Sequence, residues 1–185
     1  MAHPNILDKE KTALVIVDFQ EAFRDSIPDF GALAENISRV VQGFRVLGVP
    51  IIVTEQYPRG LGHTAKEILE VLPPDLVCIE KSSFSSCGAG GFINRLNSHG
   101  SKQVLLCGLE THICVNQTAH DLLDQGLAVH ILEDSVGSRT EADKKTGLSK
   151  MKASGAVASS IEMALFELMG DSKHQKFKEI QNLIK

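Results

Sequence analysis

Short apolar runs recur along the chain, and segments with helical spacing separate most of them. Six of these runs have the length of a β-strand, at 12–17, 49–54, 76–79, 103–107, 128–132 and 156–159. Apolar residues three and four apart predict helices over 32–44 and 112–125, with Gly48 and Gly126 as their C-terminal stops. Strands that alternate with helices are typical of βαβ units, so the pattern predicts an α/β fold with a parallel sheet.

Polar residues mark further helix starts. Two Ser-x-x-Glu segments, 138–141 and 159–162, have the spacing of a capping box and place helix starts near residues 139 and 160. The tail 172–185 predicts a polar C-terminal helix. Its one apolar stripe is formed by Phe177, Ile180 and Ile184. We expect this stripe to pack on the parent domain, with packing on a partner subunit as the alternative.

The composition indicates an ordinary globular protein. The length of 185 residues fits one domain over 1–185 with a sizeable core. Hydrophobic content of 43% and charged content of 23% are typical of this class. No stretch approaches the roughly 20 apolar residues of a membrane span, and the N-terminal residues lack the form of a signal peptide. The net charge of −4 provides no basic field for nucleic acid. We therefore expect neither a membrane nor a nucleic-acid partner.

The four cysteines do not follow the pattern of a disulfide scaffold or a metal site. Cys78 and Cys107 lie inside apolar runs, and no C-x-x-C pair occurs. This usage predicts a reducing, cytoplasmic location. Cys78, Cys87 and Cys107 are interpreted as structural residues.

Three reactive side chains each follow a strand-like run, namely Asp18, Lys81 and Cys114. Ligands of open parallel sheets bind at the carboxyl ends of the strands, so we expect the three side chains to converge there. Together they supply a base, a cation and a nucleophile. Taken singly, each has an ordinary explanation: Asp18 caps a turn, Lys81 is a solvated charge, and Cys114 is a small buried side chain.

The segments around these residues match the motifs of a known family. VIVDFQEAF near the start, KSSFS in the middle and GLETHICV contain Asp18, Lys81 and Cys114 in that order. On these motifs the chain resembles the isochorismatase-like cysteine hydrolases, which include nicotinamidases and N-carbamoyl amidohydrolases. The likeness runs from about residue 11 to about residue 169, and the poorly characterised isochorismatase domain-containing branch is the most similar. The resemblance implies a three-layer α/β/α fold around a six-stranded, mainly parallel sheet.

The resemblance also implies a mechanism. Cys114 attacks an amide or carbamoyl carbon, ammonia or an amine leaves, and water hydrolyses the resulting thioester. Asp18 acts as base and later as acid, and the backbone N–H groups of Glu110 and Cys114 bind the oxyanion. A cis peptide between Leu109 and Glu110 belongs to the same pattern. A free cysteine has a pKa near ~8.5, so we expect Lys81 and the helix start to lower the pKa of Cys114. Lys81 is also expected to keep Asp18 ionised.

Two departures from family patterns narrow the chemistry. Metal-dependent nicotinamidases carry an Asp-x-His motif and further histidines after the second strand, whereas this chain has only Glu55 and His63 there. One glutamate and one histidine make a poor zinc site. We therefore expect no metal or other cofactor, and His63 is interpreted as a loop or helix-start residue. True isochorismatases lack the nucleophilic cysteine, so Cys114 favours hydrolysis of an acyl or carbamoyl compound.

We expect residues in the segments that follow the strands to form the walls of a substrate pocket. The candidate substrate-binding residues are Phe19, Gln20, Phe23, Gln56, Tyr57, Phe84 and His112. Most are apolar or aromatic, which suits a small and fairly flat ligand. Phe19 and Phe23 are equally consistent with an ordinary core. His120, farther along the predicted helix, is interpreted as a packing or solvent-exposed residue.

The leading hypothesis is a cysteine hydrolase that cleaves a C–N bond of a small-molecule substrate. One alternative is a binding or assembly module in which the three reactive residues are vestigial. Another is a redox-responsive protein, because an exposed cysteine of low pKa is easily oxidised. Family members are usually dimers or larger assemblies, so the resemblance implies a homo-oligomer, either a dimer or a tetramer.

Overall fold

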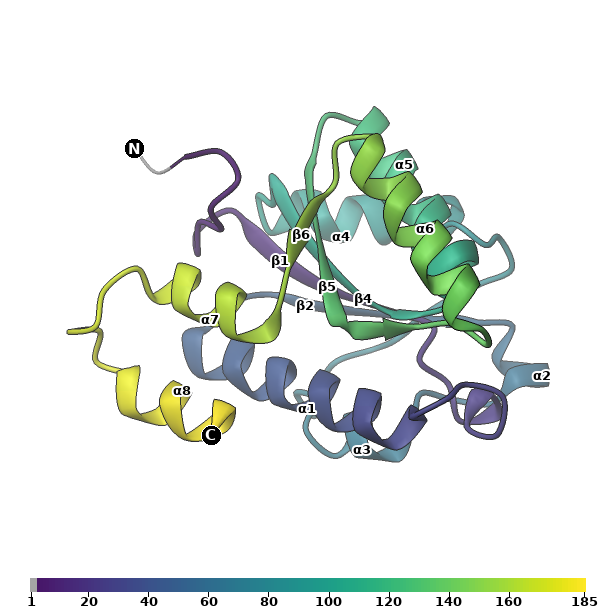
Figure 1. The fold of residues 1–185 in the computed structure, drawn as a ribbon, viewed down its shortest axis with the longest axis horizontal. Helices are drawn as coiled ribbons and strands as arrows, with labels where there is room; N and C mark the ends of the chain where they lie inside the picture. The colour runs from purple at the N-terminus through teal and green to yellow at the C-terminus, as the bar shows by residue number, and fades with distance from the viewer. Residues whose placement is uncertain (1–2) are drawn as a thin grey trace.

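The computed structural model describes residues 3–185 and contains a six-stranded sheet with helices on both faces (Figure 1). The strands are β1 (Thr12–Val17), β2 (Ile51–Gln56), β3 (Ile79–Lys81), β4 (Gln103–Leu109), β5 (Ala128–Gly137) and β6 (Val157–Ser159). Their order is β3-β2-β1-β4-β5-β6, and every neighbouring pair is parallel. The predicted α/β fold with a parallel sheet is confirmed.

Helices form the two outer layers. They are α1 (Phe30–Leu47), α2 (Pro58–Leu61), α3 (Lys66–Leu69), α4 (Phe92–Ser98), α5 (Asn116–Asp124), α6 (Glu141–Ala153), α7 (Ile161–Met169) and α8 (Phe177–Ile184). In Figure 1, α1, α3, α7 and α8 lie on one side of the sheet and α4, α5 and α6 on the other, which confirms the three-layer α/β/α arrangement. Within 3–185, no helix has the length and apolar character needed to cross a membrane.

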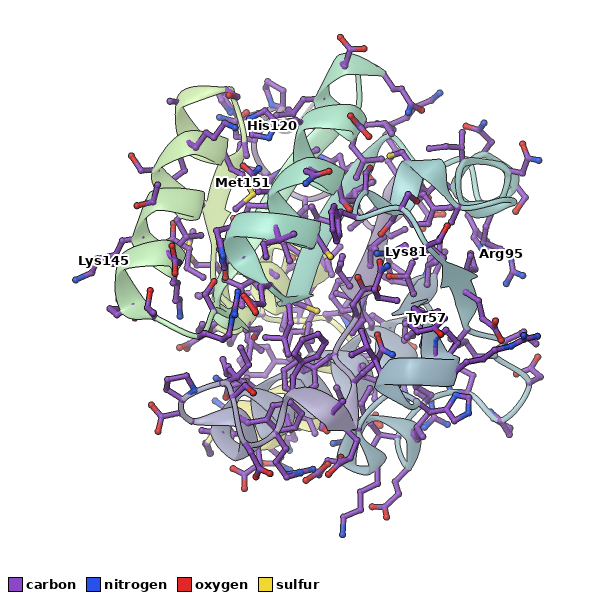
Figure 2. All side chains as sticks on the ribbon, turned by 90° about the vertical axis from the view of Figure 1, so that its right-hand side faces the viewer. Tyr57, Lys81, Arg95, His120, Lys145 and Met151 are labelled. Atoms are coloured by element: carbon purple, nitrogen blue, oxygen red, sulfur yellow. The ribbon has the colours of Figure 1, made fainter. Side chains whose placement is uncertain are left out.

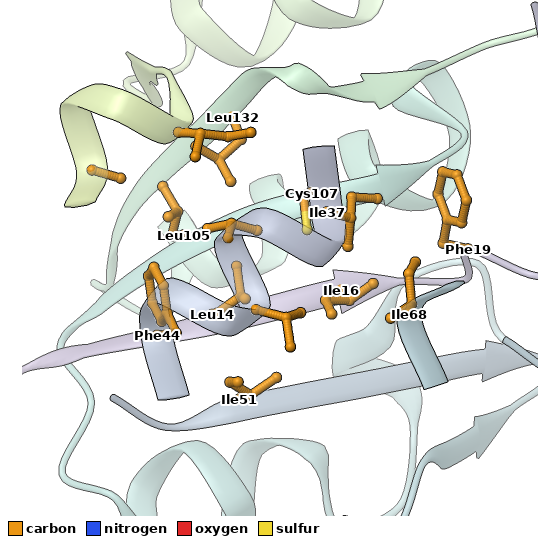
Figure 3. Packing of buried hydrophobic residues seen from close by; sticks show 14 of the residues in the cluster. Leu14, Ile16, Phe19, Ile37, Phe44, Ile51, Ile68, Leu105, Cys107 and Leu132 are labelled. Atoms are coloured by element: carbon orange, nitrogen blue, oxygen red, sulfur yellow. The ribbon is translucent and has the colours of Figure 1, made fainter. Parts of the chain in front are cut away.

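Strand β1 explains why the central strands are apolar throughout. Leu14 and Ile16 point into the core next to α1, as Figure 3 shows. Ala13, Val15 and Val17 belong to the core on the opposite face. Because helices cover both faces of the sheet, apolar residues are required at successive positions rather than at alternate ones.

Only the first predicted run, 12–17, has the bounds of its strand; β2 is shifted by two residues, β6 starts one residue later, and the other three strands also differ. β3 starts at Ile79 because it pairs only with the last residues of β2, and Val77 before it is 70% exposed. β4 continues to Leu109, and β5 continues to Gly137 beyond the polar stretch 133–135 that ends its apolar run. Both strands therefore reach farther toward the carboxyl edge of the sheet than hydrophobicity alone indicates.

Gly108 allows β4 to approach β1 closely at this edge. Its φ is +112°, and a Cβ atom there would lie 2.0 Å from the carbonyl oxygen of Val17. Only glycine fits such a position without strain. The close approach places the residues that follow β4 beside Asp18, which follows β1.

The C-terminal helix packs on the core of this chain. Ile180 is fully buried, and Phe177 and Ile184 contact the cluster that also includes α1. The Phe177 ring meets Phe166 of α7 edge-on, with 6.0 Å between the ring centroids. The predicted stripe is therefore correct, although the helix begins at Phe177, after turns, rather than at residue 172.

The start of α6 differs from the predicted capping box. Thr140 caps the helix, and its Oγ1 accepts the N–H of Asp143 at 3.1 Å. The prediction that placed the cap at Ser138 is wrong, because Ser138 Oγ lies 3.0 Å from His112 Nδ1 instead. The other predicted start is correct to within one residue, since Ser160 caps α7.

Thr140→Ala is expected to lower the free energy of unfolding by about 1 kcal/mol, because the N–H of Asp143 loses its acceptor. Thr146→Ala, at an exposed position inside α6, is the matched control. It should cause no loss, since alanine is the better helix former. Urea denaturation of the two variants checks this, and equal stabilities would show that Thr140 contributes nothing as a cap.

Candidate active site

The carboxyl ends of β1, β2 and β3 bring the predicted base, Asp18, and the predicted cation, Lys81, into contact. Lys81 Nζ donates to Asp18 Oδ2 at 2.5 Å, and Thr54 Oγ1 donates to Asp18 Oδ1 at 2.7 Å. The side chains of Asp18 and Lys81 are 1% and 0% exposed. Both oxygens of the Asp18 carboxylate therefore have fixed protein donors, and the carboxylate is held in a single orientation.

Lys81 is bound on all sides. Besides Asp18, its Nζ lies within hydrogen-bond distance of Gln56 Oε1 at 2.7 Å, Ser83 O at 3.0 Å and Phe84 O at 2.9 Å. An ammonium group has three N–H donors, so these acceptors saturate it. The structure thus places Lys81 as a buried cation that orients Asp18.

The protonation of Cys114 differs from the expectation. Burial, the largest effect, and the charge of Asp18 together raise the pKa of the Cys114 thiol to about 12, although the charge of Lys81 opposes them. The predicted lowering of this pKa is wrong, because burial next to a carboxylate outweighs the single cation. The resting side chain is a neutral thiol close enough to the carboxylate of Asp18 for each group to shift the pKa of the other.

Asp18 is also less acidic than a free aspartate. Burial raises the pKa of its carboxyl group, although the charge of Lys81, the hydrogen bonds from Lys81 and Thr54 and the nearby Cys114 thiol act in the opposite direction. A carboxylate of raised pKa takes up a proton more readily than an ordinary one. Both groups therefore hold a proton more firmly than their free forms do.

A cavity of about 400 Å³ opens at these residues. Its lining consists of Asp18, Ala22, Phe23, Ser26, Gln56, Leu61, Phe84, Leu109, Glu110, Ile113, Cys114 and Arg139. This volume is in the range of small-molecule sites. Of the predicted wall residues, Phe23, Gln56 and Phe84 line the cavity.

Two other predicted wall residues belong to the protein interior. Phe19 is fully buried and packs against Phe30 with 4.4 Å between ring centroids, so the alternative of an ordinary core residue is correct. Gln20 is also fully buried, and its Nε2 donates to the carbonyl oxygens of Gln56 at 3.0 Å and Gly62 at 2.6 Å. Gln20 therefore links the end of β2 to the loop at Gly62 through hydrogen bonds, and it is not among the residues that line the cavity.

The two remaining wall predictions lie outside the cavity lining. Tyr57 is 59% exposed, and its backbone is left-handed with a φ of 40°. His112 is held with its Nδ1 3.0 Å from Ser138 Oγ. His120 packs between α5 and α6, where its Nε2 lies 3.0 Å from Ser154 Oγ, far from the labelled Lys81 in Figure 2.

The segment after β4 also differs from expectation. No peptide bond within residues 3–185 is cis, so the cis bond implied between Leu109 and Glu110 is absent and Glu110 has an ordinary extended backbone. Cys114 lies in a π-helical turn, Thr111–Val115, which precedes α5. The Glu110 side chain is 6% exposed and lines the cavity.

Arg139 is the main lining residue that the sequence analysis missed. It follows the end of β5, and its Nε lies 2.9 Å from Glu110 Oε1. The rule that polar residues after strands form the site also applies to this strand. The apolar run that predicted β5 stops at residue 132, whereas the strand ends five positions later, at Gly137. Arg139 therefore was not recognised as a residue that directly follows a strand.

No group of three or more His, Cys, Asp and Glu side chains in the described part of the chain is arranged to hold a metal ion. His63 lies in a loop with its Nδ1 3.0 Å from Glu55 Oε2. Hydrogen bonds from the N–H and Oγ1 of Thr64, both at 2.7 Å, also hold the Glu55 carboxylate.

A comparison with protein families decides the classification. The family model described as the isochorismatase domain matches residues 12–163, which include all three reactive residues. The chain belongs to the isochorismatase family. Its six-stranded sheet and the site at the carboxyl edge agree with the fold that the family resemblance implies.

Relatives within the isochorismatase family cover nearly the whole chain. Isochorismatase domain-containing protein 2 of Danio rerio is 40% identical over 100% of this chain and 92% of its own length. Isochorismatase domain-containing protein 1 of Salmo salar is 41% identical over 94% of this chain, which spans 61% of that longer protein. A Caenorhabditis elegans structure named MAR1 ribonuclease has a TM-score of 0.92 and 38% identity, over 96% of this chain and 91% of that one.

Proposed function

We propose that this protein is a cysteine hydrolase that cleaves a C–N bond of a small amide or carbamoyl compound through a thioester. The observation that carries the proposal is the proximity of a thiol, Cys114, and an oriented carboxylate, Asp18, which line the same cavity. A nucleophile beside its base at the wall of a cavity is the usual arrangement for covalent catalysis.

The raised pKa of Cys114 favours proton transfer during attack rather than before it. As Sγ forms a bond to the carbonyl carbon, the thiol proton passes to Asp18. The carboxyl group then gives this proton to the nitrogen as the C–N bond breaks, and the amine or ammonia leaves. Water attacks the thioester carbon and gives a proton to Asp18, which returns it to sulfur when the carboxylic acid is released.

Two groups assist these steps in the proposal. Lys81 keeps Asp18 in position and balances its charge while the proton is elsewhere. The backbone N–H groups of Glu110 and Cys114 bind the oxygen of the tetrahedral intermediate, for which a single donor is typically worth about 10² to 10³ in rate. The apolar cavity walls, with Phe23 and Phe84, support a small and fairly flat substrate.

Ammonia release from a panel of primary amides and N-carbamoyl compounds tests the proposal. The wild type is expected to turn over at least one compound and to show a thioester adduct on Cys114 by mass spectrometry. Cys114→Ala should do neither, and Cys87→Ala is the matched control because Cys87 lies outside the cavity lining. A panel without turnover and without any adduct would favour the binding or assembly module.

Two other activities, redox sensing by Cys114 and RNA cleavage, are not expected. The raised pKa of Cys114 speaks against a redox-responsive thiol, since thiolates are the readily oxidised form. RNA belongs in the panel because of the name of the nematode relative. A net charge of −4 gives little attraction for a polyanion, and we expect no RNA cleavage.

We also propose a single domain over 1–185, a cytoplasmic location and a homo-oligomer, either a dimer or a tetramer. The exposed aromatic side chains of Tyr57 and Phe84, 59% and 55% exposed, support self-association. Sedimentation velocity is expected to show a species larger than the 20.1 kDa chain. A monomer at all concentrations would contradict the oligomer.

A further inference from the structure

The loop 82–88, which follows β3, provides backbone acceptors for the buried cation. It turns back so that the carbonyl oxygens of Ser83 and Phe84 lie 3.0 Å and 2.9 Å from Lys81 Nζ. Gln56 Oε1, at 2.7 Å, is a third acceptor. These three acceptors match the three N–H donors of an ammonium group. Lys81 therefore keeps a full set of hydrogen-bond partners even when Asp18 is not counted.

Two side chains of α5 hold this loop. Thr118 Oγ1 accepts the backbone N–H of Ser86 at 2.9 Å, and Asp121 Oδ2 accepts the hydroxyl of Ser85 at 2.6 Å. Thr118 and Asp121 are three positions apart, so they lie on the same face of the helix. Thr118 and Ser86 are both fully buried. Loss of the Thr118 hydroxyl would therefore leave the N–H of Ser86 buried without this acceptor.

The same helix follows the turn that contains the nucleophile. The π-helical turn 111–115 runs directly into α5, and Cys114 and Thr118 are four residues apart. The contacts therefore run from the helix next to the thiol to the loop, and from the loop carbonyls to the ammonium group of Lys81. The end of β2 also contacts the loop, since Gln56 Nε2 donates to the carbonyl oxygen of Ser82 at 2.8 Å. A loop that is fixed on α5 thus sets the place of the cation relative to the thiol.

The loop itself is compact. Ser83 Oγ donates to the carbonyl oxygen of Ser85 at 2.8 Å. A Cβ atom at Gly88 would lie 2.6 Å from Ser83 Oγ, so the two ends of the loop pack closely. A displacement at Ser86 is therefore transmitted to the carbonyl oxygens next to Lys81.

We propose that Thr118 and Asp121 are positioning residues that hold the loop on α5, so that its carbonyl oxygens fix the ammonium group of Lys81. This rests on the proposed function, in which Lys81 balances the charge of the base. Neither positioning residue lines the cavity, so both act through the loop and not on the substrate. Carbonyl oxygens that accept from an ammonium group favour its charged form. Without the two anchors, the buried ammonium loses its proton more readily, and the thiol loses a stabilising cation.

Iodoacetamide labelling of Cys114 in the Asp18→Asn background measures the effect without a substrate. In this background the charge of Lys81 is the main influence that lowers the pKa of the thiol. Thr118→Val keeps a similar shape and changes no charge, but it removes the acceptor of the Ser86 N–H. We expect it to raise the midpoint of labelling by about one pH unit, which slows labelling about tenfold below the midpoint.

Three controls accompany this measurement. Thr118→Ser retains the hydroxyl and should retain the midpoint of the background variant. Thr146→Val, at an exposed position of α6, is the matched control and should also leave the midpoint unchanged. Cys107 is fully buried on β4 and should remain unlabelled, which shows that the fold is intact. An unchanged or lowered midpoint in folded Thr118→Val would overturn the proposal.

Variants of Asp121 provide a second test in which charge and position predict opposite directions. The charge of Asp121 raises the pKa of Cys87, so its removal alone would lower the pKa of a nearby thiol. Asp121→Ala is expected instead to raise the labelling midpoint of Cys114, because Ser85 loses its acceptor. Asp121→Asn keeps an acceptor and should stay near the background midpoint. Asp121 is exposed, so this pair decides the question if Thr118→Val does not fold. A lowered midpoint in Asp121→Ala would overturn the proposal.

The labelling experiment and the amide panel fail independently of each other. A raised midpoint in a protein that hydrolyses no amide would count against the hydrolase alone. An unchanged midpoint in an active hydrolase would overturn the positioning role of Thr118 and Asp121 and leave the proposed function in place.

Discussion

Asp18→Asn is expected to slow amide hydrolysis by about 10³-fold while making Cys114 easier to alkylate. The first effect follows because asparagine cannot accept the thiol proton, and general acid–base catalysis contributes about 10² to 10⁴ in rate. The second follows from charge: the carboxylate of Asp18 raises the pKa of Cys114, and Lys81 lowers it. Without the carboxylate of Asp18, the lowering charge of Lys81 is opposed only by the smaller effect of Glu110.

The direction of the second effect can be measured without a substrate. In the wild type, alkylation by iodoacetamide should increase only at high pH, since the pKa of Cys114 is about 12. In Asp18→Asn the midpoint should move down toward the ordinary value of ~8.5. Cys87, whose own pKa burial raises to about 11, is an internal control that should not move. An unchanged midpoint for Cys114 would mean that the charge of Asp18 does not act on the thiol.

Lys81→Met is expected to remove about 3–5 kcal/mol from the free energy of unfolding and to abolish turnover. Asp18 would then be a buried carboxylate without its cation, and breaking a buried ion pair at one partner typically costs this amount. The two side chains are 1% and 0% exposed, so water cannot replace the missing charge. The carboxyl group would take up a proton and cease to act as a base.

A double variant separates the lost charge from lost packing. Asp18→Asn combined with Lys81→Met leaves no isolated charge, so it should be more stable than Lys81→Met alone. Denaturant unfolding of the single and double variants measures this coupling. If the two losses are simply additive, the ion pair contributes no interaction energy and Lys81 acts only through packing.

Much of the candidate site could be predicted from the sequence, because one geometric rule applies to three of its residues. Side chains that follow parallel strands meet at the same edge, so Asp18, Lys81 and Cys114 are brought to one cavity region. The same rule failed for Phe19 and Gln20, which also follow β1. The direction of a side chain beyond a strand depends on the local turn, here the left-handed Asp18 with a φ of 48°, and not on the order of residues.

The alternation of apolar runs and helical spacing by itself determined an α/β fold with a parallel sheet. The sequence also contains the three reactive residues within family motifs, and the resemblance on those motifs implied the three-layer α/β/α arrangement. Only the tertiary structure decided the chemical state of those residues. The pKa of Cys114 results from burial and from the distances to two opposite charges that are remote in sequence. Likewise, Arg139 reaches the cavity because β5 continues past its apolar run, through pairing with β4. Burial, charge proximity and strand pairing are properties of long-range contacts, and periodicity along the chain does not specify them.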